Sequence, residues 1–221
     1  MKATGLIAAA GSGERLGAGG PKAFVPLGGR PMLDWSLDAF RAAPRIGAIV
    51  VAVPPELPPG PSASLHEVRV VEGGASRSES VANAIEAVEG EIVVVHDAAR
   101  PLVGAELIEA VLERLESDPG CDAVVAAAAV TDTIKQAGRG MEVERTLDRT
   151  ALWAAQTPQA FRVEALREAL ASSSLAEATD DAMLLERLGR RVVLHEAPPS
   201  NLKVTTPLDL RLAEELLRER G

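Results

Sequence analysis

Short apolar runs alternate with amphipathic stretches along most of the chain, and this alternation constrains the fold more than any other feature of the sequence. The runs are rich in Val, Ile and Ala and lack polar alternation, as parallel strands covered on both faces do. Strands are expected at 5–10, 48–53, 68–71, 92–95, 123–128 and 192–194, and helices at 32–42, 78–88, 105–117, 163–171, 180–187 and 207–220. The pattern predicts an α/β fold.

Two segments interrupt the alternation. Residues 54–64 contain five prolines, too many for a helix or a central strand, and are expected to form an exposed connection. Residues 131–149 place Thr-, Ile- and Val-rich pieces around Gln-Ala-Gly-Arg-Gly, which is typical of a hairpin or arm. We therefore predict a single domain over 1–221: a Rossmann-like, mostly parallel twisted sheet with helices on both faces and a protruding β-arm at about 131–149.

Composition excludes several classes of partner. The formal net charge of −9 leaves no broad basic surface for a nucleic-acid backbone. Cys121 is the only cysteine, so an internal disulfide and a cysteine zinc site are excluded. No apolar run approaches the roughly 18 residues of a membrane span, and the N-terminus lacks a signal-peptide pattern. We expect a cytoplasmic protein that binds neither nucleic acid nor membrane.

A glycine-rich loop follows the first predicted strand. Its glycines allow main-chain N–H groups to approach an anion, and Arg15 and Lys22 add the positive charge that a polyphosphate needs. A dinucleotide fingerprint would need glycine at Leu16, and a Walker loop would need Gly-Lys-Ser/Thr, whereas Lys22 follows Pro21. The loop alone therefore leaves two interpretations open, a nucleotide site or a glycine-rich βα connection with solvated basic residues.

Five blocks, taken together and in order, resemble a known family. They are 8–22, 73–80, 95–101, 148–161, and 179–182 with 201–209. The loop and the Gly28-Gly29-Arg30-Pro31 segment resemble nucleotidyltransferases that form NDP-sugars and CDP-alcohols. More specifically, the five blocks resemble the 2-C-methyl-D-erythritol 4-phosphate cytidylyltransferases of the non-mevalonate isoprenoid pathway.

The resemblance implies a reaction and its components. The phosphate of 2-C-methyl-D-erythritol 4-phosphate would attack the α-phosphorus of CTP in line, giving 4-diphosphocytidyl-2-C-methyl-D-erythritol and pyrophosphate. Mg²⁺ or a similar divalent cation would assist. The family's arm crosses to the other subunit of a homodimer, so arm exchange is implied here. Ribitol 5-phosphate, the acceptor of related cytidylyltransferases, is the alternative acceptor.

The resemblance also implies site residues. The catalytic residues would be Arg15, Lys22, Arg149 and Lys203. The nucleotide would be bound by Ala9, Ala10, Gly11, Gly13, Gly74, Ser80 and Asp97. The acceptor would be bound by Arg100, Thr133, Arg149, Thr157, Thr179 and Lys203. No residue is assigned as a metal ligand, although Asp97 is a candidate for contact directly or through water. Two departures from the usual pattern, Ala23 for Gln and Asp181 for Glu, carry none of this chemistry.

Structural interpretations stand beside these roles. Asp97 and Arg100 would cap the strand end as an ion pair, and Lys203 would be an ordinary solvated lysine. His96 is expected to be packed rather than catalytic, because no partner is visible in the sequence.

Helix starts offer further structural interpretations. Ser78 or Ser80 would be a helix N-cap, and residues 178–182 would be another. Pro207 would lie near the start of the last helix. Residues 153–161 would be a helix entry with a proline-restricted turn.

Two further function classes compete with nucleotidyl transfer. A nucleotide-dependent oxidoreductase is disfavoured by Leu16 at the third glycine position. A non-catalytic nucleotide-binding regulator would keep the loop but would have no use for Arg149 and Lys203.

Overall fold

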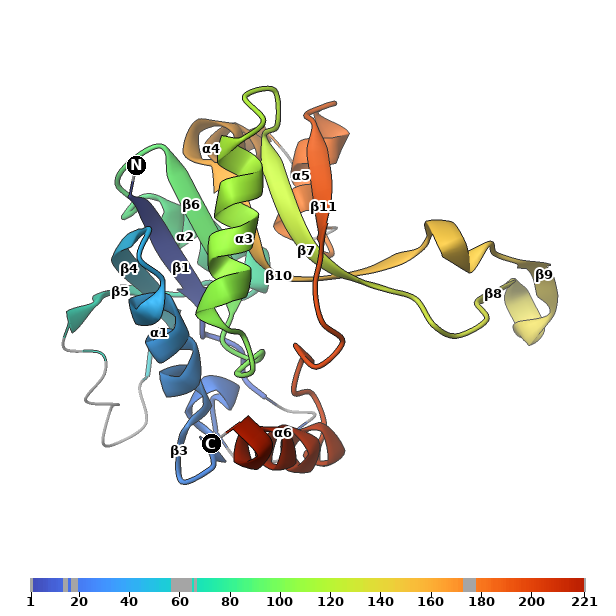
Figure 1. Cartoon of the computed structure of the whole chain (residues 1–221), viewed down its shortest axis with the longest axis horizontal. Coiled ribbons are helices and arrows are strands. Elements are labelled where there is room, and N and C mark those ends of the chain that lie inside the picture. Colours follow the sequence, from blue (N-terminus) through green and yellow to red (C-terminus); the bar gives the residue numbers. More distant parts are fainter. Residues whose placement is uncertain are drawn as a thin grey trace.

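One seven-stranded sheet forms the centre of the chain in the computed structural model, which describes residues 2–13, 16, 20–56, 65, 67–172 and 178–220 (Figure 1). Its strands are β1 (Ala3–Ala8), β4 (Ile46–Val53), β5 (Arg69–Glu72), β6 (Ile92–Asp97), β7 (Ala123–Ala129), β10 (Trp153–Arg162) and β11 (Val192–Glu196). The spatial order is β11-β7-β10-β6-β1-β4-β5, and every neighbouring pair is parallel except the two that involve β10. The predicted α/β class and mostly parallel sheet are confirmed.

Strand β10 is the central element that the sequence pattern did not predict. The helix-entry interpretation of 153–161 is wrong, because these residues pair antiparallel with both β6 and β7. The interior of the strand carries polar residues and Pro158, which together resemble a loop. The pairing with β7 is interrupted between Ala155 and Gln159, so Pro158 lies where no ladder hydrogen bond is required. Gln156, Thr157 and Gln159 are nevertheless buried.

Of the α-helices in the described ranges, five cover the two faces of the sheet and the last one lies outside these layers. The helices are α1 (Met32–Ala42), α2 (Arg77–Ile85), α3 (Ala105–Glu116), α4 (Val163–Ser172), α5 (Asp181–Arg187) and α6 (Pro207–Arg220). Apolar residues of α1 and α3 pack with Ile7 on one face, and those of α2, α4 and α5 pack with Leu6 on the other. Adjacent strand residues point to opposite faces, so β1 contributes to both cores. No helix in the described ranges is both long and apolar enough to cross a membrane.

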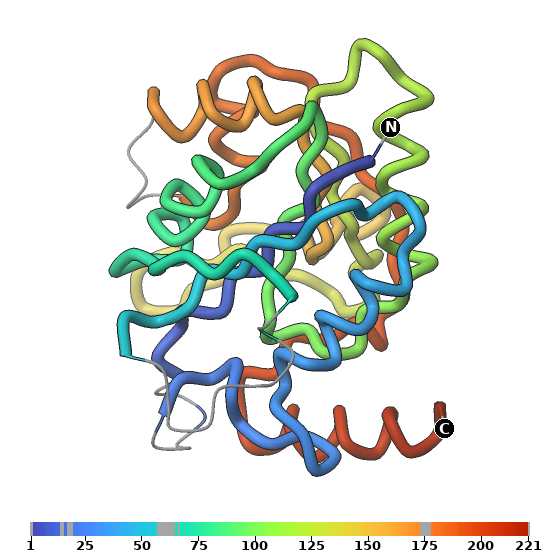
Figure 2. The backbone as a smooth tube through the Cα atoms, turned by 90° about the vertical axis from the view of Figure 1, so that its left-hand side faces the viewer, coloured from blue at the N-terminus to red at the C-terminus, as the bar shows by residue number. Residues whose placement is uncertain are grey.

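Helix α6 lies outside the two layers. It begins at Pro207, as predicted, and packs against the short hairpin β2 (Pro26–Leu27) and β3 (Arg30–Pro31). Figures 1 and 2 both show α6 beside this hairpin, below the sheet. Val204, just before the helix, is fully buried, and its N–H donates to Ala99 O at 2.8 Å. This contact places the segment around Lys203 next to the end of β6.

The segment between β7 and β10 forms an arm. Strands β8 (Lys135–Ala137) and β9 (Val143–Thr146) pair antiparallel, and the arm extends away from the sheet (Figure 1). The predicted hairpin over 131–149 is therefore confirmed. Met141 and Val143 in the arm are 84% and 60% exposed.

Candidate active site

A cavity of about 590 Å³ opens at the carboxyl ends of β1 and β6, where open α/β sheets hold ligands. All seven residues predicted to bind the nucleotide line it: Ala9, Ala10, Gly11, Gly13, Gly74, Ser80 and Asp97. Lys22 and Lys203 line it too, so two of the predicted catalytic cations face this space. Arg15 lies outside the described residues.

Glycines allow the walls of this cavity to come together. A Cβ atom at Gly73 would lie 2.3 Å from the Cβ of Ala10 and 2.9 Å from Ser80 Oγ. Gly13 has φ +74°, and a Cβ atom there would lie 2.9 Å from the Cβ of Lys22. Glycine at positions 73 and 13 therefore lets neighbouring segments pack closely around the cavity.

The N-terminus of α2 faces the same cavity. Its N-cap is Ser76, whose side chain accepts a hydrogen bond from Glu79 N–H at 3.1 Å, so the predicted cap at Ser78 or Ser80 is wrong. Ser80 instead donates from Oγ to Ser76 O at 2.8 Å and accepts from Gly74 N–H at 3.1 Å. Ser80 Oγ therefore meets the cavity with acceptor capacity, beside the positive end of the helix.

A second cavity of about 210 Å³ adjoins the first, between the middle of β10 and the start of α5. Four of the predicted acceptor residues line it: Arg100, Thr157, Thr179 and Lys203. Asp180, the N-cap of α5, accepts from Met183 N–H at 2.9 Å and also lines this cavity, so the predicted cap at 178–182 is confirmed. Three residues line both cavities: Arg77, Asp97 and Lys203.

The two remaining acceptor residues lie elsewhere. Thr133 and Arg149 belong to the segment that carries the arm and line neither cavity of the same chain. The Arg149 guanidinium donates to Thr131 O, which holds its side chain at the base of the arm. A single chain therefore does not bring Arg149 to Lys203.

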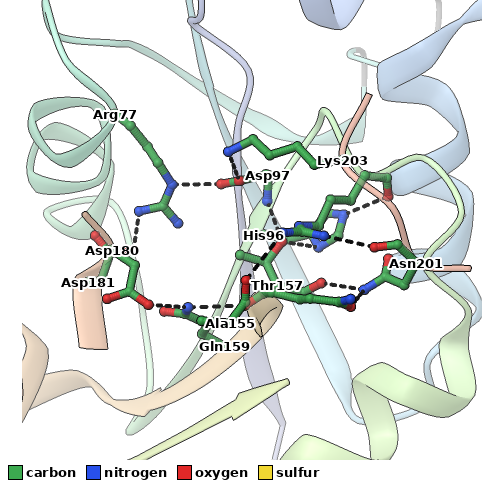
Figure 3. A network of polar contacts seen from close by, with 12 residues as sticks. Arg77, His96, Asp97, Ala155, Thr157, Gln159, Asp180, Asp181, Asn201 and Lys203 are labelled. Atoms are coloured by element: carbon green, nitrogen blue, oxygen red, sulfur yellow. Dashed lines mark hydrogen bonds and ion pairs between the residues drawn. The ribbon is translucent and has the colours of Figure 1, made fainter. Parts of the chain in front are cut away.

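Asp97 is the charged centre of the site (Figure 3). Arg77 Nε donates to its Oδ1 and Lys203 Nζ to its Oδ2, both at 2.6 Å. Burial would raise the pKa of Asp97, but the two cations outweigh it and hold this pKa well below its usual range. Lys203 is therefore not simply a solvated lysine.

The predicted pair between Asp97 and Arg100 is also wrong. Arg100 instead donates from Nη1 to Asn201 O at 2.8 Å and from Nη2 to Ala155 O at 3.4 Å. These contacts join the end of β6 to β10 and to the segment before α6. Arg100 thereby fixes two walls of the smaller cavity.

Arg77 is a site residue to which the sequence analysis gave no role. Its Nη1 donates to Asp181 Oδ2 at 2.7 Å, and the Asp181 side chain is fully buried. Burial raises the pKa of Asp181, and Arg77 opposes that rise. The departure at Asp181 therefore lies in the charge network of the site, although the sequence analysis gave it no part in the chemistry. Arg77 stood within the recognised block 73–80, but nothing in the sequence connects it with a carboxylate 104 positions away.

His96 is packed, as expected, and it orders the end of β6. Its Nε2–H donates to Arg100 O at 3.2 Å, because a carbonyl only accepts. Thr157 Oγ1 accepts from Asp97 N–H at 3.0 Å and donates to His96 Nδ1 at 3.1 Å. This chain of hydrogen bonds needs a neutral ring, and burial lowers the pKa of His96 to about 4.

Acidification should therefore destabilise the chain through His96. The unfolded chain binds a proton near the ordinary pKa of 6.5, whereas the folded chain keeps His96 neutral down to about 4. Between these values the unfolded state holds more protons, so the free energy of unfolding falls as the pH falls. The two pKa values correspond to a loss of about 3 kcal/mol. Urea unfolding at pH 7, 5.5 and 4.5 measures it.

The control separates His96 from the carboxylates that titrate in the same range. His96→Gln keeps a side chain that can donate and accept, and its unfolding free energy should decline less steeply between pH 7 and 4.5 than that of the wild type. The same exchange at His195, which is half-buried on edge strand β11, controls for the loss of a histidine as such. Parallel profiles for wild type and His96→Gln would contradict the assignment.

The described residues do not by themselves form a metal site. Among the described residues, no group of three or more His, Cys, Asp or Glu side chains could hold an ion. Asp97 is the one carboxylate among the described residues that line the larger cavity. Mg²⁺ is commonly held by one or two carboxylates together with substrate phosphates. Asp97 would contact a metal ion only together with the phosphates of a substrate, and both of its oxygens already accept hydrogen bonds from Arg77 and Lys203.

The fold and the site together define a class of protein. A doubly wound sheet carries a glycine-lined, cation-bearing cavity at the carboxyl ends of its strands, with a helix N-terminus facing it. A smaller polar cavity adjoins it and shares its charged residues. These are the features of an enzyme that joins a nucleotide to a second, smaller substrate.

Comparisons with known proteins identify the family. The model of the family described as IspD, 2-C-methyl-D-erythritol 4-phosphate cytidylyltransferase, matches residues 4–219. Proteins of that name from Symbiobacterium thermophilum and Nocardia farcinica are 45% and 46% identical to the chain. Each alignment covers 98% of the chain, together with 93% and 94% of the respective relative.

Solved structures agree with these relatives. The cytidylyltransferase of this name from Thermus thermophilus has a TM-score of 0.82 and 39% identity, with 99% of this chain and 100% of that chain covered. The 4-diphosphocytidyl-2C-methyl-D-erythritol synthase from Anaerococcus prevotii has a TM-score of 0.86 and 27% identity, covering 98% and 96%. The chain belongs to the 2-C-methyl-D-erythritol 4-phosphate cytidylyltransferase family. It is a nucleotidyltransferase, so the oxidoreductase and regulator interpretations are set aside.

Proposed function

We propose that the chain transfers CMP from CTP to 2-C-methyl-D-erythritol 4-phosphate, giving 4-diphosphocytidyl-2-C-methyl-D-erythritol and pyrophosphate for isoprenoid precursor synthesis. The observation that carries this proposal is the pair of adjoining cavities that share Arg77, Asp97 and Lys203. CTP would occupy the larger cavity and the acceptor the smaller one. Nothing in the comparisons favours ribitol 5-phosphate as the acceptor.

The chemistry follows from where charge develops. An oxygen of the acceptor phosphate forms a bond to the α-phosphorus while the bond to the pyrophosphate oxygen breaks, so no side-chain base is required. Lys22 would stabilise the charge on the phosphate oxygens in the transition state, with Arg15 as its predicted companion. Lys203 would hold the acceptor phosphate, and Arg100, Thr157 and Thr179 would hold the rest of the acceptor. A divalent cation such as Mg²⁺ would offset part of the negative charge of the triphosphate.

The nucleotide contacts are proposed on the same basis. Gly11 and Gly13 would present main-chain N–H groups to the phosphates, and Ala9, Ala10, Gly74 and Ser80 would meet the edge of cytosine. Asp97 would face the ribose and the cation. Ser80 Oγ supports this arrangement, because its remaining acceptor capacity suits the amino group of cytosine.

Pyrophosphate release tests the proposal. The chain is incubated with Mg²⁺ and each of CTP, UTP and ATP, with either 2-C-methyl-D-erythritol 4-phosphate or ribitol 5-phosphate. We expect release only from CTP with the methylerythritol phosphate, and its loss on addition of EDTA. Release with ribitol 5-phosphate alone would identify ribitol 5-phosphate as the acceptor. No release with any pair would contradict the proposed reaction.

We also propose that the enzyme works as a cytoplasmic homodimer with exchanged arms. The arm extends from the sheet with exposed apolar residues, and its Thr133 and Arg149 line neither cavity of their own chain. Crossing to a second subunit would allow both residues to complete the partner's acceptor cavity. The single free cysteine, Cys121, which is buried, suits a reducing compartment.

Hybrid dimers test arm exchange. A chain with Arg149→Ala and a chain with Lys22→Ala should each be nearly inactive. When the two are unfolded together and refolded as a mixture, some dimers combine an intact Lys22 cavity with an intact Arg149 arm, and activity should return to about a quarter of the wild-type level. Mixing Lys22→Ala with Lys203→Ala is the control. If both lysines serve the cavity of their own subunit, every site in a hybrid dimer carries one of the two changes, and activity should not return. Recovery in this mixture would mean that Lys203 acts in trans. Absence of recovery in the first mixture would indicate self-contained subunits.

A further inference from the structure

Asp97 holds two cations on separate oxygens, and only one of these cations is anchored elsewhere (Figure 3). Arg77 bridges Asp97 and Asp181, at 2.6 Å and 2.7 Å, and Asp181 is fully buried at the start of α5. Lys203 Nζ has Asp97 as its one hydrogen-bond or ion-pair partner among the described residues. The two contacts to Asp97 therefore differ in how easily they can be released.

The two side chains also differ in freedom. A guanidinium is a planar fork that is held rigidly when it bridges two carboxylates, whereas the lysine ammonium is a compact charge on a flexible four-carbon stem. The Lys203 side chain is 40% exposed, against 24% for Arg77. If Lys203 leaves, Asp97 remains paired with Arg77. If Arg77 leaves, Asp181 is buried without its cation, which is strongly unfavourable.

The difference between the Arg77 and Lys203 contacts matters for the reaction because of where these groups lie. Arg77, Asp97 and Lys203 line both cavities, so they lie where the acceptor phosphate must meet the α-phosphorus. A phosphate dianion entering there offers Lys203 a second anion within reach of a stem rotation. Among the described side chains, only Arg77 would then hold Asp97 in position as its ion-pair partner.

We propose that Arg77, anchored by Asp181, is a positioning residue that holds the Asp97 carboxylate while Lys203 is transferred from Asp97 to the acceptor phosphate. The inference rests on the proposed function, because it takes the smaller cavity as the acceptor site. It adds that the lysine is exchanged between two anions during each turnover. It also adds that the buried Arg77–Asp181 pair makes the exchange possible.

The exchange can be followed directly at Lys203. The chain has only four lysines, at positions 2, 22, 135 and 203. Lysine labelled with ¹⁵N at Nζ therefore gives a simple NMR spectrum, in which Lys203→Arg identifies the Lys203 signal. Titration with 2-C-methyl-D-erythritol 4-phosphate, without CTP and hence without turnover, should shift this signal in the wild type. A wild-type Lys203 signal that does not respond would overturn the proposal.

Arg77→Lys tests the clamp, because it keeps the charge but replaces the rigid fork, whose Nε and Nη1 each hold one carboxylate, with a single ammonium on a flexible stem. Asp97 should then retain Lys203, so at least tenfold more acceptor phosphate is needed to shift the Lys203 signal. The KM for the acceptor should rise at least tenfold and kcat should fall, while the KM for CTP changes less than threefold. Arg45→Lys is the matched control: Arg45 also bridges two carboxylates, Glu109 at 3.3 Å and Glu116 at 3.1 Å, and lines neither cavity.

Asp181→Asn keeps the test decisive if Arg77→Lys does not fold. Arg77 still contacts Asp97 in this variant, but the negative charge that anchors Arg77 is lost. The KM for the acceptor and the acceptor concentration needed to shift the Lys203 signal should each rise about threefold. Wild-type acceptor KM and an unchanged Lys203 titration in the folded variants would overturn the proposal, since a purely structural role would alter stability alone. A wild-type chain that releases no pyrophosphate would contradict the proposed function instead, so the two failures are distinguishable.

Discussion

Lys22→Ser is expected to lower kcat by about 10²–10³-fold, the cost of losing one preorganised group that stabilises transition-state charge. Lys22 lines the larger cavity directly after the glycine loop, and its N–H donates to Gly11 O at 3.1 Å. The backbone contact and the close packing against Gly13 survive the substitution, so the loop should keep its shape. The lost ammonium acts on the triphosphate and most strongly on the charge that develops as the α-phosphorus is attacked.

Steady-state kinetics separate this effect from weaker binding. The KM for 2-C-methyl-D-erythritol 4-phosphate should change by less than about threefold, because the acceptor lies in the other cavity, and calorimetry should find CTP bound less tightly but still measurably. Lys2→Ser, at the exposed start of the chain, is the control for losing a lysine. An unchanged kcat for Lys22→Ser would remove Lys22 from the catalytic residues.

Asp97→Asn is expected to be the most damaging single isosteric change for stability and activity together. The carboxylate accepts from Arg77 and Lys203 on its two oxygens, whereas an amide has one oxygen and turns N–H donors toward the other cation. Breaking a buried pair in this way costs about 3–5 kcal/mol, of which the partial exposure of Lys203 removes a share. Urea unfolding at pH 7 should show a loss of about 3 kcal/mol, and kcat/KM should fall about a hundredfold.

The pH dependence of Asp97→Asn provides an internal check. Because the folded pKa of Asp97 lies below its unfolded value of about 3.9, its stabilisation is complete above that pH and is lost on acidification. The difference in unfolding free energy between wild type and variant should therefore shrink below about pH 4. Asp118→Asn, which breaks an exposed pair with Arg191, should unfold close to the wild type. A constant difference at every pH would contradict the role given to the charge.

Local sequence patterns predicted the strands and helices whose formation depends mainly on neighbouring residues. The parallel strands are continuous apolar runs, and helices such as α3 repeat apolar residues at Ile108, Val111, Leu112 and Leu115, so periodicity alone locates them. The residues around the larger cavity could also be located from the sequence, because most of them directly follow β1, β5 and β6. Their roles came from resemblance rather than from pattern.

Long-range pairing could not be predicted in the same way. Strand β10 is polar in its middle and carries Pro158, so its pattern resembles a turn, and only tertiary pairing with β6 and β7 makes it a strand. The Arg77–Asp181 pair joins positions 104 apart. Ser76 caps α2 in preference to the two serines that follow, a choice that depends on where the backbone leaves the helical conformation.

The place of β10 in the sheet has a consequence for how the molecule is built during synthesis. The adjacent strands β5, β4, β1 and β6 all precede residue 98, whereas β7 and β11 reach them only through β10. Because a chain emerges from the ribosome N-terminus first, the half of the sheet that carries the glycine loop can pair long before β10 is made. Insertion of β10 between β6 and β7 then closes the sheet, and both cavities are completed only when the later segment that carries Lys203 has been made.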